Sequence, residues 1–445
     1  MPKPKSPRLR TQIICPHCWH VFTPDQVLWI SESPDLLGDS RLGEMAQQRF
    51  LPHRFDVKAN AIDAEGFACT KMACPHCHLI VPRTLFEMPL FFLSIVGAPA
   101  AGKSYYLASM SWLLRKTLPR HFQYGILDTL PEMNHRLHEY ESQQFFETGE
   151  NRIVAIEKTE VYSETNNTVV INGQEIAYPQ PFLFSLTPTR SHTHYRYRDQ
   201  LQQILCLYDN AGESYLPGED KALLPLTQHL SRSRAILFLY DPTQDPRFRK
   251  ACRGKTNDPQ MIDATNGRSI RRSQVRQELI LSEMTHRVRT HGSTSATTLG
   301  FSSDLQKNAP LLIVVITKAD AWSHLLGDVK FESPWRPVGI DDSYCALDMP
   351  TVLQMSAKCR KLLADMVPEF VGSAEQLTRN VLYVPVSATG ISPMVNPETG
   401  ALGFRPDDIR PFWVEVPILC SLTLQNRGMI PQLRRRDENE LRGKR

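Results

Sequence analysis

The sequence contains no run of about 20 consecutive apolar residues, the length that a membrane-spanning helix requires. Its best apolar runs, 90–96 and 311–316, are short and end in polar or glycine-rich sequence, so we interpret them as buried strands. The N-terminus also lacks the apolar segment of a secretory signal before Cys15. Ten cysteines without such a signal favour metal ligands or free thiols over disulfides, and we expect the protein to be cytoplasmic.

A strong excess of one charge is missing from the body of the chain. The net charge is +4, but the first ten residues carry four bases and no acid, and the last twelve carry six bases and three acids. The residues between have a net charge of about −3, so we expect no direct contact with nucleic acid. We interpret 1–10 and 431–445 as disordered basic tails, with weak attraction to an acidic partner as the alternative.

The body divides into two regions. Residues 11–88 contain two copies of Cys-Pro-His-Cys, and from 89 to about 430 short apolar runs alternate with helical patterns, which predicts an α/β fold with a mostly parallel sheet. Continuous apolar runs are typical of strands covered on both faces, and they occupy 90–96, 181–186, 204–208, 235–240, 311–316 and 381–386. Helices are predicted after Gly102 and over 133–146, 269–290 and 409–424.

Two insertions, at about 119–180 and 243–309, exceed what such a sheet needs. The first contains an Asn172-Gly173 turn between β-rich segments. The second ends in a Ser/Thr/Gly-rich linker, 291–304, which we expect to be mobile.

The segment 97–104 reads G-A-P-A-A-G-K-S and matches the phosphate-binding pattern G-x-x-x-x-G-K-[ST]. It follows an apolar strand and opens a predicted helix, so that backbone N–H groups of a curled loop can surround phosphate oxygens. Lys103 is predicted to reach the β- and γ-phosphates, and Ser104 to bind Mg²⁺. The predicted nucleotide-binding residues here are Gly97, Ala98, Pro99, Ala100, Ala101, Gly102, Lys103, Ser104 and Tyr105. No G-x-G-x-x-G occurs at this strand end, which argues against a Rossmann dinucleotide site.

The next motif, Asp209-Asn210-Ala211-Gly212, follows the apolar run 204–208 and reads D-x-x-G. Asp209 is predicted to hold Mg²⁺ through water and the Gly212 N–H to contact the γ-phosphate, the contact on which the order–disorder switch of GTPases depends. Glu213 stands where many GTPases have a water-orienting Gln, and it could either polarise a water or repel the γ-phosphate. We therefore expect slow hydrolysis, at roughly 10⁻⁴–10⁻² s⁻¹. Asp241, after another apolar run, is a competing Mg²⁺ candidate, although Asp241-Pro242 is more typical of a turn.

Two later motifs favour guanine. Thr317-Lys318-Ala319-Asp320 is similar to the N-K-x-D motif of GTPases, with Thr in place of Asn. The Asp320 carboxylate can accept hydrogen bonds from guanine N1–H and the 2-amino group, a pair that adenine does not offer, and the Lys318 stem would lie along the purine face. Ser387-Ala388 is similar to the S-A-K/L loop, in which the Ala388 N–H would contact guanine O6.

The sequence leaves several candidates for the switch I threonine. They are Thr187, Thr189 and Thr193 in the loop after 181–186, and Thr159, Thr165 and Thr168 upstream. Candidates for an arginine supplied within the chain crowd the same loop, at Arg190, Arg196 and Arg198. A solvated loop without a catalytic role is the alternative.

Cys15-Pro16-His17-Cys18 and Cys74-Pro75-His76-Cys77 each offer two thiolates on one tight turn, here called a knuckle. Together Cys15, Cys18, Cys74 and Cys77 predict a closed, structural Zn²⁺ site. The span 19–73 between the knuckles exceeds the usual 15–20 residues and predicts an inserted subdomain. Cys-Pro-His-Cys is also a thioredoxin-type redox motif, but that chemistry needs one motif at a helix start in a βαβ unit. Cys69 is either a spare ligand or a core thiol, and the histidines beside the knuckles are predicted bystanders.

In this order, the four nucleotide motifs resemble those of the translation-factor/Ras-like class of P-loop GTPases, from about residue 90 to the last helix. The resemblance implies a three-layer, mostly parallel sheet, GTP or GDP with Mg²⁺ as ligands, and GTP hydrolysis. The N-terminal knuckles, the D-x-A-G-E wording of 209–213 and the long insertions look like a narrower prokaryotic group, the double-GTPase proteins of bacterial conflict and defence systems. That resemblance implies a regulatory switch that acts with effector proteins or a second GTPase.

Two other classes of protein stay open at this point. A P-loop ATPase or kinase would share the phosphate loop but would not need the placement of Asp320 and Ala388. A scaffold protein could hold a nucleotide without turning it over.

Overall fold

The computed structural model describes residues 9–146, 153–156, 166–209, 228–262, 276–298, 310–338, 344–397 and 400–433. Gly212, Glu213, Thr159, Thr165 and most of both basic tails lie outside these ranges. None of the helices within them combines the length and the hydropathy that crossing a bilayer demands.

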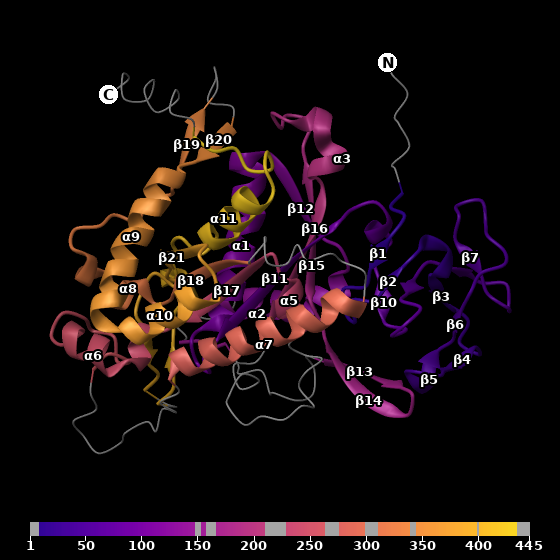
Figure 1. Cartoon of the computed structure of the whole chain (residues 1–445), viewed down its shortest axis with the longest axis horizontal. Coiled ribbons are helices and arrows are strands. Elements are labelled where there is room, and N and C mark those ends of the chain that lie inside the picture. Colours follow the sequence, from indigo (N-terminus) through magenta and orange to yellow (C-terminus); the bar gives the residue numbers. More distant parts are fainter. Residues whose placement is uncertain are drawn as a thin grey trace.

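A seven-stranded sheet forms the centre of the molecule (Figure 1). In spatial order its strands are β12 (Tyr124–Asp128), β15 (Phe182–Pro188), β16 (Gln203–Asp209), β11 (Leu90–Gly97), β17 (Ala235–Tyr240), β18 (Leu311–Ile316) and β21 (Val381–Pro385). The strands from β16 to β21 are parallel, and β15 runs antiparallel to both of its neighbours. All six strands predicted from continuous apolar runs are present, with ends that differ by one or two residues.

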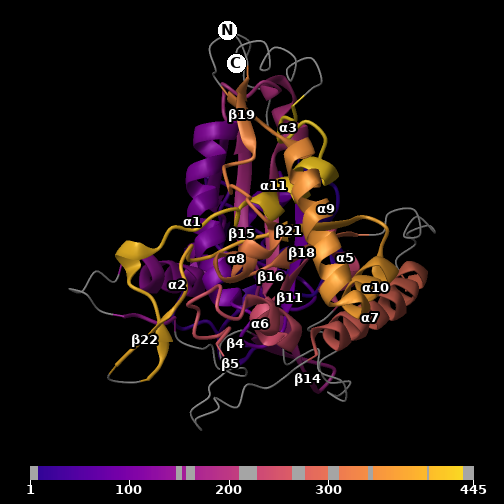
Figure 2. The same ribbon diagram turned by 90° about the vertical axis from the view of Figure 1, so that its left-hand side faces the viewer.

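Helices lie on both sides of this sheet (Figure 2). On one side are α1 (Lys103–Phe122) and α2 (His135–Phe145), and on the other are α7 (Gln277–Thr298), α9 (Met349–Met366) and α10 (Pro368–Leu377). Shorter helices are α3 (Arg198–Leu201), α5 (His229–Arg232), α6 (Pro246–Cys252), α8 (Ala319–Trp322) and α11 (Val416–Gln425). The mixed α/β class with a mostly parallel sheet is therefore confirmed.

Two helix predictions need correction. The last helix begins at Val416 and not at residue 409, because Trp413 takes a left-handed φ of 60° and a proline in the first turn then starts α11. In the second insertion α7 continues to Thr298, so residues 291–298 of the expected mobile linker are helical. A helix anchored by packing extends readily, since each added residue brings its own hydrogen bond.

The N-terminal region is a module of short strands. In it β1 (Ile13–Ile14) pairs with β2 (Val21–Phe22), and a four-stranded sheet contains β10 (Ile80–Val81), β9 (Met72–Ala73), β3 (Leu28–Ile30) and β6 (Arg49–Phe50) in that order. The span between the knuckles adds two hairpins, β4 (Leu37–Asp39) with β5 (Gly43–Gln47) and β7 (Ala61–Ile62) with β8 (Ala68–Cys69).

Three further hairpins belong to the insertions and the C-terminal part. They are β13 (Asn166–Ile171) with β14 (Gln174–Pro179), β19 (Trp335–Val338) with β20 (Tyr344–Leu347), and β22 (Met394–Val395) with β23 (Leu402–Gly403). Asn172 and Gly173 join β13 to β14 with φ of 53° and 78°, so the predicted two-residue turn is confirmed.

The N-terminal module covers one face of the sheet at β11, β15 and β16. Alternate side chains of these strands enter two different cores: Leu93 and Leu205 pack in the core that contains α1, whereas Cys206 packs in the core of the module with Trp19. The continuous apolar sequence of these strands thus reflects cover on both faces, with the N-terminal module on the face opposite α1.

Tyr208 joins the module to the sheet. Its hydroxyl accepts a hydrogen bond from Trp19 Nε1 at 2.9 Å and donates one to the Pro16 carbonyl at 2.5 Å. Its ring stacks on His229, with 4.6 Å between the ring centroids. Burial raises the pKa of Tyr208 well above its ordinary value, so the phenol keeps the proton that it donates.

We predict that Tyr208→Phe lowers the free energy of unfolding by about 1–3 kcal/mol, because a buried indole N–H and a buried carbonyl lose their shared partner. Denaturant unfolding followed by tryptophan fluorescence measures this. The control is Tyr124→Phe. The Tyr124 hydroxyl makes one long hydrogen bond, of 3.4 Å, to the Leu201 carbonyl, so its removal should lower the free energy of unfolding by less than about 1 kcal/mol. Equal stability of Tyr208→Phe and wild type would contradict the prediction.

Candidate functional site

A cavity of about 810 Å³ opens at the carboxyl ends of the parallel strands. Residues that directly follow β11, β18 and β21 line it, together with the last residue of β16. Of the predicted nucleotide-site residues, the cavity contacts Ala98, Pro99, Ala100, Ala101, Gly102, Lys103, Ser104, Tyr105, Asp209, Thr317, Lys318, Asp320, Ser387 and Ala388. Residues of four motifs from distant parts of the sequence therefore meet around one space, with Asp209 as the described residue of the second motif.

The predicted phosphate loop connects β11 to α1 through a strained backbone. Ala100 and Gly102 have φ of 60° and 86°, and Gly102 is suited to this because it has no Cβ. Ala100 does have a side chain, and such strain concentrates at ligand sites. The N-cap residue of α1 is Gly102, which has no side chain to cap the helix, so the first N–H groups of this 20-residue helix are available to an anion at its positive end.

Asp209 ends β16, the strand beside the phosphate loop. Its Oδ2 lies 3.6 Å from an Arg136 guanidinium nitrogen, and its Oδ1 is buried without a hydrogen-bond partner among the described residues. A buried, unsatisfied carboxylate oxygen that borders a cavity with Ser104 is a suitable ligand, direct or through water, for a hard cation such as Mg²⁺.

Lys318 crosses toward the phosphate loop from the strand end after β18. It has a left-handed φ of 55°, and its Nζ donates to Asp241 Oδ2 at 2.6 Å and to Thr243 Oγ1 at 3.2 Å. Asp241 is fully buried and also accepts the Thr243 N–H, so it caps the turn at Pro242 as expected from the sequence. It does not border the cavity, which leaves Asp209 as the better Mg²⁺ candidate of the two.

Asp320 and the 387–388 loop form the other end of the cavity. Ser387 Oγ donates to Asp320 Oδ1 at 2.5 Å, and burial raises the pKa of the Asp320 carboxyl while this hydrogen bond opposes the shift. The Ala388 carbonyl accepts hydrogen bonds from Ser109 on α1 at 2.6 Å and from Gln144 on α2 at 3.0 Å. Behind the loop Gly390 has φ of 73°, and a Cβ there would lie 1.9 Å from the Arg410 carbonyl oxygen.

Sequence reasoning missed several residues that border the cavity. They come from the insertions and the C-terminal hairpin and are Arg136, Ile156, Asp258, Gln260, Leu402 and Phe404. Asp258 is 1% exposed, and burial raises its pKa to about 6. No motif marks these positions, because they lie in the insertions and at the C-terminal hairpin, away from the segments that directly follow the parallel strands.

The candidates proposed for the loop after β15 lie at the wrong edge of the sheet. Because β15 is antiparallel to β16, the loop between them sits at the amino end of β16, opposite the end that carries Asp209. Thr187, Thr189 and Thr193, and Arg190, Arg196 and Arg198, therefore do not face the cavity. Thr168 lies in β13 and does not border the cavity either.

The two knuckles have the same geometry. In each, the N–H two residues after the first cysteine points to its sulfur at 3.4 Å, and the residue four positions on, Trp19 or His78, has a left-handed φ. The sulfur atoms of Cys15, Cys18, Cys74 and Cys77 all lie within 4.8 Å of one another. Cys69 is not part of this group and contacts Asp63 instead.

This four-cysteine cluster could bind zinc. A tetrahedron with metal–sulfur bonds of 2.3 Å has edges of about 3.8 Å, and the Cys15–Cys77 and Cys18–Cys74 sulfur pairs are both 3.7 Å apart. Burial raises the pKa of the Cys15 and Cys77 thiols, so four thiolates this close together need a cation to balance them. Both observations fit Zn²⁺.

A scan against models of known protein families finds no match to this chain, and a search of curated proteins finds no similar sequence. The functional assignment therefore depends on the geometry of the cavity and of the four-cysteine cluster.

We predict that the purified protein contains about one zinc ion per chain and that Cys74→Ser loses it, since three thiolates remain where a closed site needs four. Elemental analysis of dialysed protein measures the metal, and thermal unfolding measures the accompanying loss of stability. Cys69→Ser is the matched control, because it removes a buried thiol outside the cluster and should retain the metal. Wild-type protein that holds no zinc would refute the assignment.

Proposed function

We propose that this chain is a regulatory GTPase with a Ras-like P-loop fold, which binds GTP·Mg²⁺ in the 810 Å³ cavity and hydrolyses it slowly. The observation that carries the proposal is the meeting of Lys103, Asp209 and Asp320 around that one cavity, although they come from three different strand ends. A phosphate loop alone would fit many nucleotide-binding proteins.

The order of the strands supports this choice. Without the edge strand β12, the six remaining strands occur in the spatial order second, third, first, fourth, fifth, sixth along the chain, and the second is antiparallel. With neighbouring strands about 4.8 Å apart, the end of β18 lies roughly 10 Å from the phosphate loop. That separation suits a ligand whose phosphates and base bind at opposite ends of the cavity.

Guanine is the base that the far end suits best. The Asp320 carboxylate is an acceptor held by Ser387, and guanine presents two adjacent donors, N1–H and the 2-amino group, to such an acceptor. Adenine would leave this partly buried carboxylate without those partners, which disfavours ATP. The Lys318 stem, 4.0 Å from the position of a Cβ on Gly102, is placed to cover a base beside the phosphate loop.

The residues of the phosphate end would bind and orient the triphosphate. The uncapped N–H groups of α1 and the Lys103 ammonium bind phosphate oxygens, and Ser104 and Asp209 are the residues that would hold Mg²⁺. When bound, Mg²⁺ would supply positive charge that offsets the negative charge of the phosphates. A water then needs to be aligned with the γ-phosphorus, for which the sequence offers Glu213.

A regulatory role follows from the connection between Asp209 and the N-terminal module. Tyr208, which precedes Asp209, is hydrogen-bonded to Trp19 and Pro16 beside the first knuckle. The single buried residue Tyr208 thus connects the N-terminal module to the proposed Mg²⁺ ligand, and a partner that binds this module could act on that ligand through it. We propose effector proteins or a second GTPase as partners, in line with the resemblance to prokaryotic double-GTPase proteins.

We predict that Lys103→Ala weakens GTP binding by about 10²-fold or more, because a charge-assisted hydrogen bond to phosphate is worth up to about 3 kcal/mol. Titration calorimetry with GTP and Mg²⁺ measures the affinity. Lys116→Ala, on the same helix but stacked over Trp112 at 3.9 Å, should bind as wild type does. Unchanged affinity in the Lys103→Ala protein would place the phosphates elsewhere.

We predict that Asp320→Asn shifts the preference from GTP toward xanthosine triphosphate, since the amide can donate to the 2-oxo group that replaces the 2-amino group. Competition of unlabelled GTP, XTP and ATP for a fluorescent nucleotide measures the order of preference. Asp245→Asn is the control, because Asn also caps α6 and the change lies outside the cavity. If Asp320→Asn still selects GTP, the assignment of the base is wrong, and if wild type prefers ATP, the chain is an ATPase or kinase.

A further inference from the structure

Arg136 is a cation at the phosphate end of the cavity. It is the second residue of α2, borders the cavity, and lies 3.6 Å from Asp209 Oδ2. Its guanidinium carbon also sits 5.1 Å from the centre of the Phe182 ring. The side chain is only 16% exposed, so its charge is largely removed from bulk water and interacts strongly with charges nearby.

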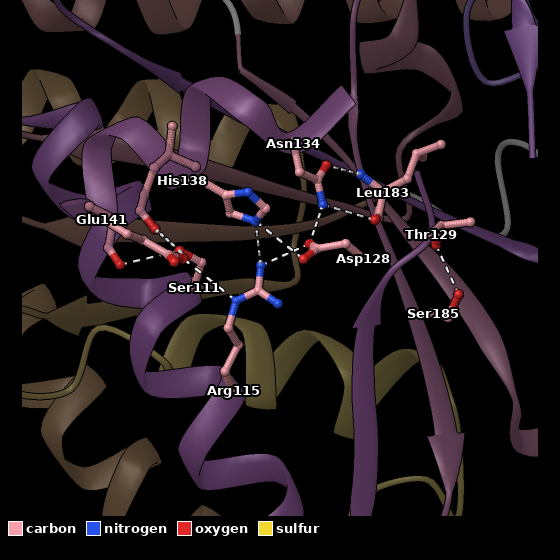
Figure 3. Close-up of polar contacts among 11 residues, drawn as sticks. Ser111, Arg115, Asp128, Thr129, Asn134, His138, Glu141, Leu183 and Ser185 are labelled. Atoms are coloured by element: carbon pink, nitrogen blue, oxygen red, sulfur yellow. Dashed lines mark hydrogen bonds and ion pairs between the residues drawn. The ribbon is translucent and has the colours of Figure 1, made fainter. Parts of the chain in front are cut away.

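A network of polar contacts holds the start of α2, and with it Arg136, in place (Figure 3). Two residues before Arg136, Asn134 accepts the Leu183 N–H at 2.9 Å and donates to the Leu183 carbonyl at 3.1 Å. Two residues after it, His138 bonds to Asp128 at 3.2 Å, and Asp128 also accepts from Arg115 of α1 at 2.8 Å. These contacts tie α2 to β12, β15 and α1 on both flanks of Arg136.

The charges around the cavity leave Arg136 a distinct role. Of the described lining residues, three are basic and three acidic: Lys103, Arg136 and Lys318, with Asp209, Asp258 and Asp320. The Lys318 ammonium is held at 2.6 Å by the buried Asp241, which does not border the cavity. Lys103 begins α1 directly after the predicted phosphate loop, and Arg136 lies beside the proposed Mg²⁺ ligand Asp209, so these two bases of the lining are at the phosphate end.

We propose that Arg136 is a built-in catalytic arginine, which leaves Asp209 for the γ-phosphate when GTP·Mg²⁺ binds and stabilises the charge that develops there during hydrolysis. This inference rests on the proposed GTPase function. Mg²⁺ would compete with Arg136 for the Asp209 carboxylate, and a planar guanidinium can instead donate two hydrogen bonds to phosphoryl oxygens. The arginines of the loop after β15, which the sequence left open as candidates for this role, lie at the opposite edge of the sheet.

The reaction is the hydrolysis of the terminal anhydride. A water oxygen forms a bond to the γ-phosphorus while the bond from that phosphorus to the β–γ bridging oxygen breaks, which yields GDP and inorganic phosphate, and the water proton passes to phosphate or solvent. Arg136 makes and breaks no covalent bond. It offsets negative charge on the γ-phosphoryl and bridging oxygens, which is the effect by which an arginine accelerates this reaction.

The test compares full-length wild type, Arg136→Ala, Arg136→Lys and Arg198→Ala in single-turnover hydrolysis of radiolabelled GTP. GTPases with an arginine in the same chain turn over at about 10⁻² s⁻¹ and those without one at about 10⁻⁴ s⁻¹, so Arg136→Ala should lose about 10²-fold in rate. Arg136→Lys should stay slow, because an ammonium does not reproduce the planar fork. Arg198→Ala is the matched control, because Arg198 also packs over an aromatic ring and pairs with an aspartate. Arg198 lies at the opposite edge of the sheet, so the hydrolysis rate of this variant should equal that of wild type.

Binding measurements distinguish a catalytic from a structural role. Arg136→Ala should bind GDP within a few-fold of wild type but lose the tight complex with GDP and aluminium fluoride, which mimics the transferring phosphoryl group. A wild-type rate in Arg136→Ala, or an equal loss of GDP and GDP–aluminium fluoride affinity, overturns the proposal. If wild type binds no GTP at all, the proposed function fails first, which the same GDP and GTP titrations reveal.

Discussion

The hydrogen bonds of the Tyr208 hydroxyl join the two parts of this molecule. Trp19 and Pro16, on the first knuckle, share one buried phenol that belongs to the central sheet. The apolar residues of β11, β15 and β16 alternate between the core that contains α1 and the core of the N-terminal module, so these strands belong to both cores. Because Asp209 is the next residue, order in the N-terminal module and the position of a proposed Mg²⁺ ligand depend on the same contact.

The parallel sheet explains how one cavity assembles from four motifs. Strands that run in the same direction present their carboxyl ends at one edge, and each motif directly follows, or ends, such a strand. The order of the strands then separates the functions along this edge, with Asp209 and the phosphate loop on neighbouring strands and Asp320 two strands further on. The two insertions add Arg136 and Asp258 to the lining of the cavity, Arg136 at the phosphate end and Asp258 beside Lys318.

Predictions from sequence were accurate where a residue's environment depends on its neighbours in the chain. The six apolar runs became strands, the Asn172-Gly173 pair formed its turn, and the two knuckles adopted one shared geometry. They were less accurate for α7 and α11, whose ends depend on packing and on the left-handed backbone at Trp413. They left open which threonine or arginine near β15 faces the cavity, because the sequence does not reveal that β15 is antiparallel and reverses the edge at which its loop emerges.

The sequence by itself determined the α/β class, the strands, the glycine-containing loop between β11 and α1, and the four cysteines that meet, since glycine placement, apolar runs and paired thiols are local properties. Only the tertiary structure decided that the N-terminal module covers the sheet on the face opposite α1, that Lys318 is held by Asp241, and that Arg136 reaches Asp209. Such contacts join residues 73 to 192 positions apart, and they form because two surfaces exclude water together, which no spacing along the chain encodes.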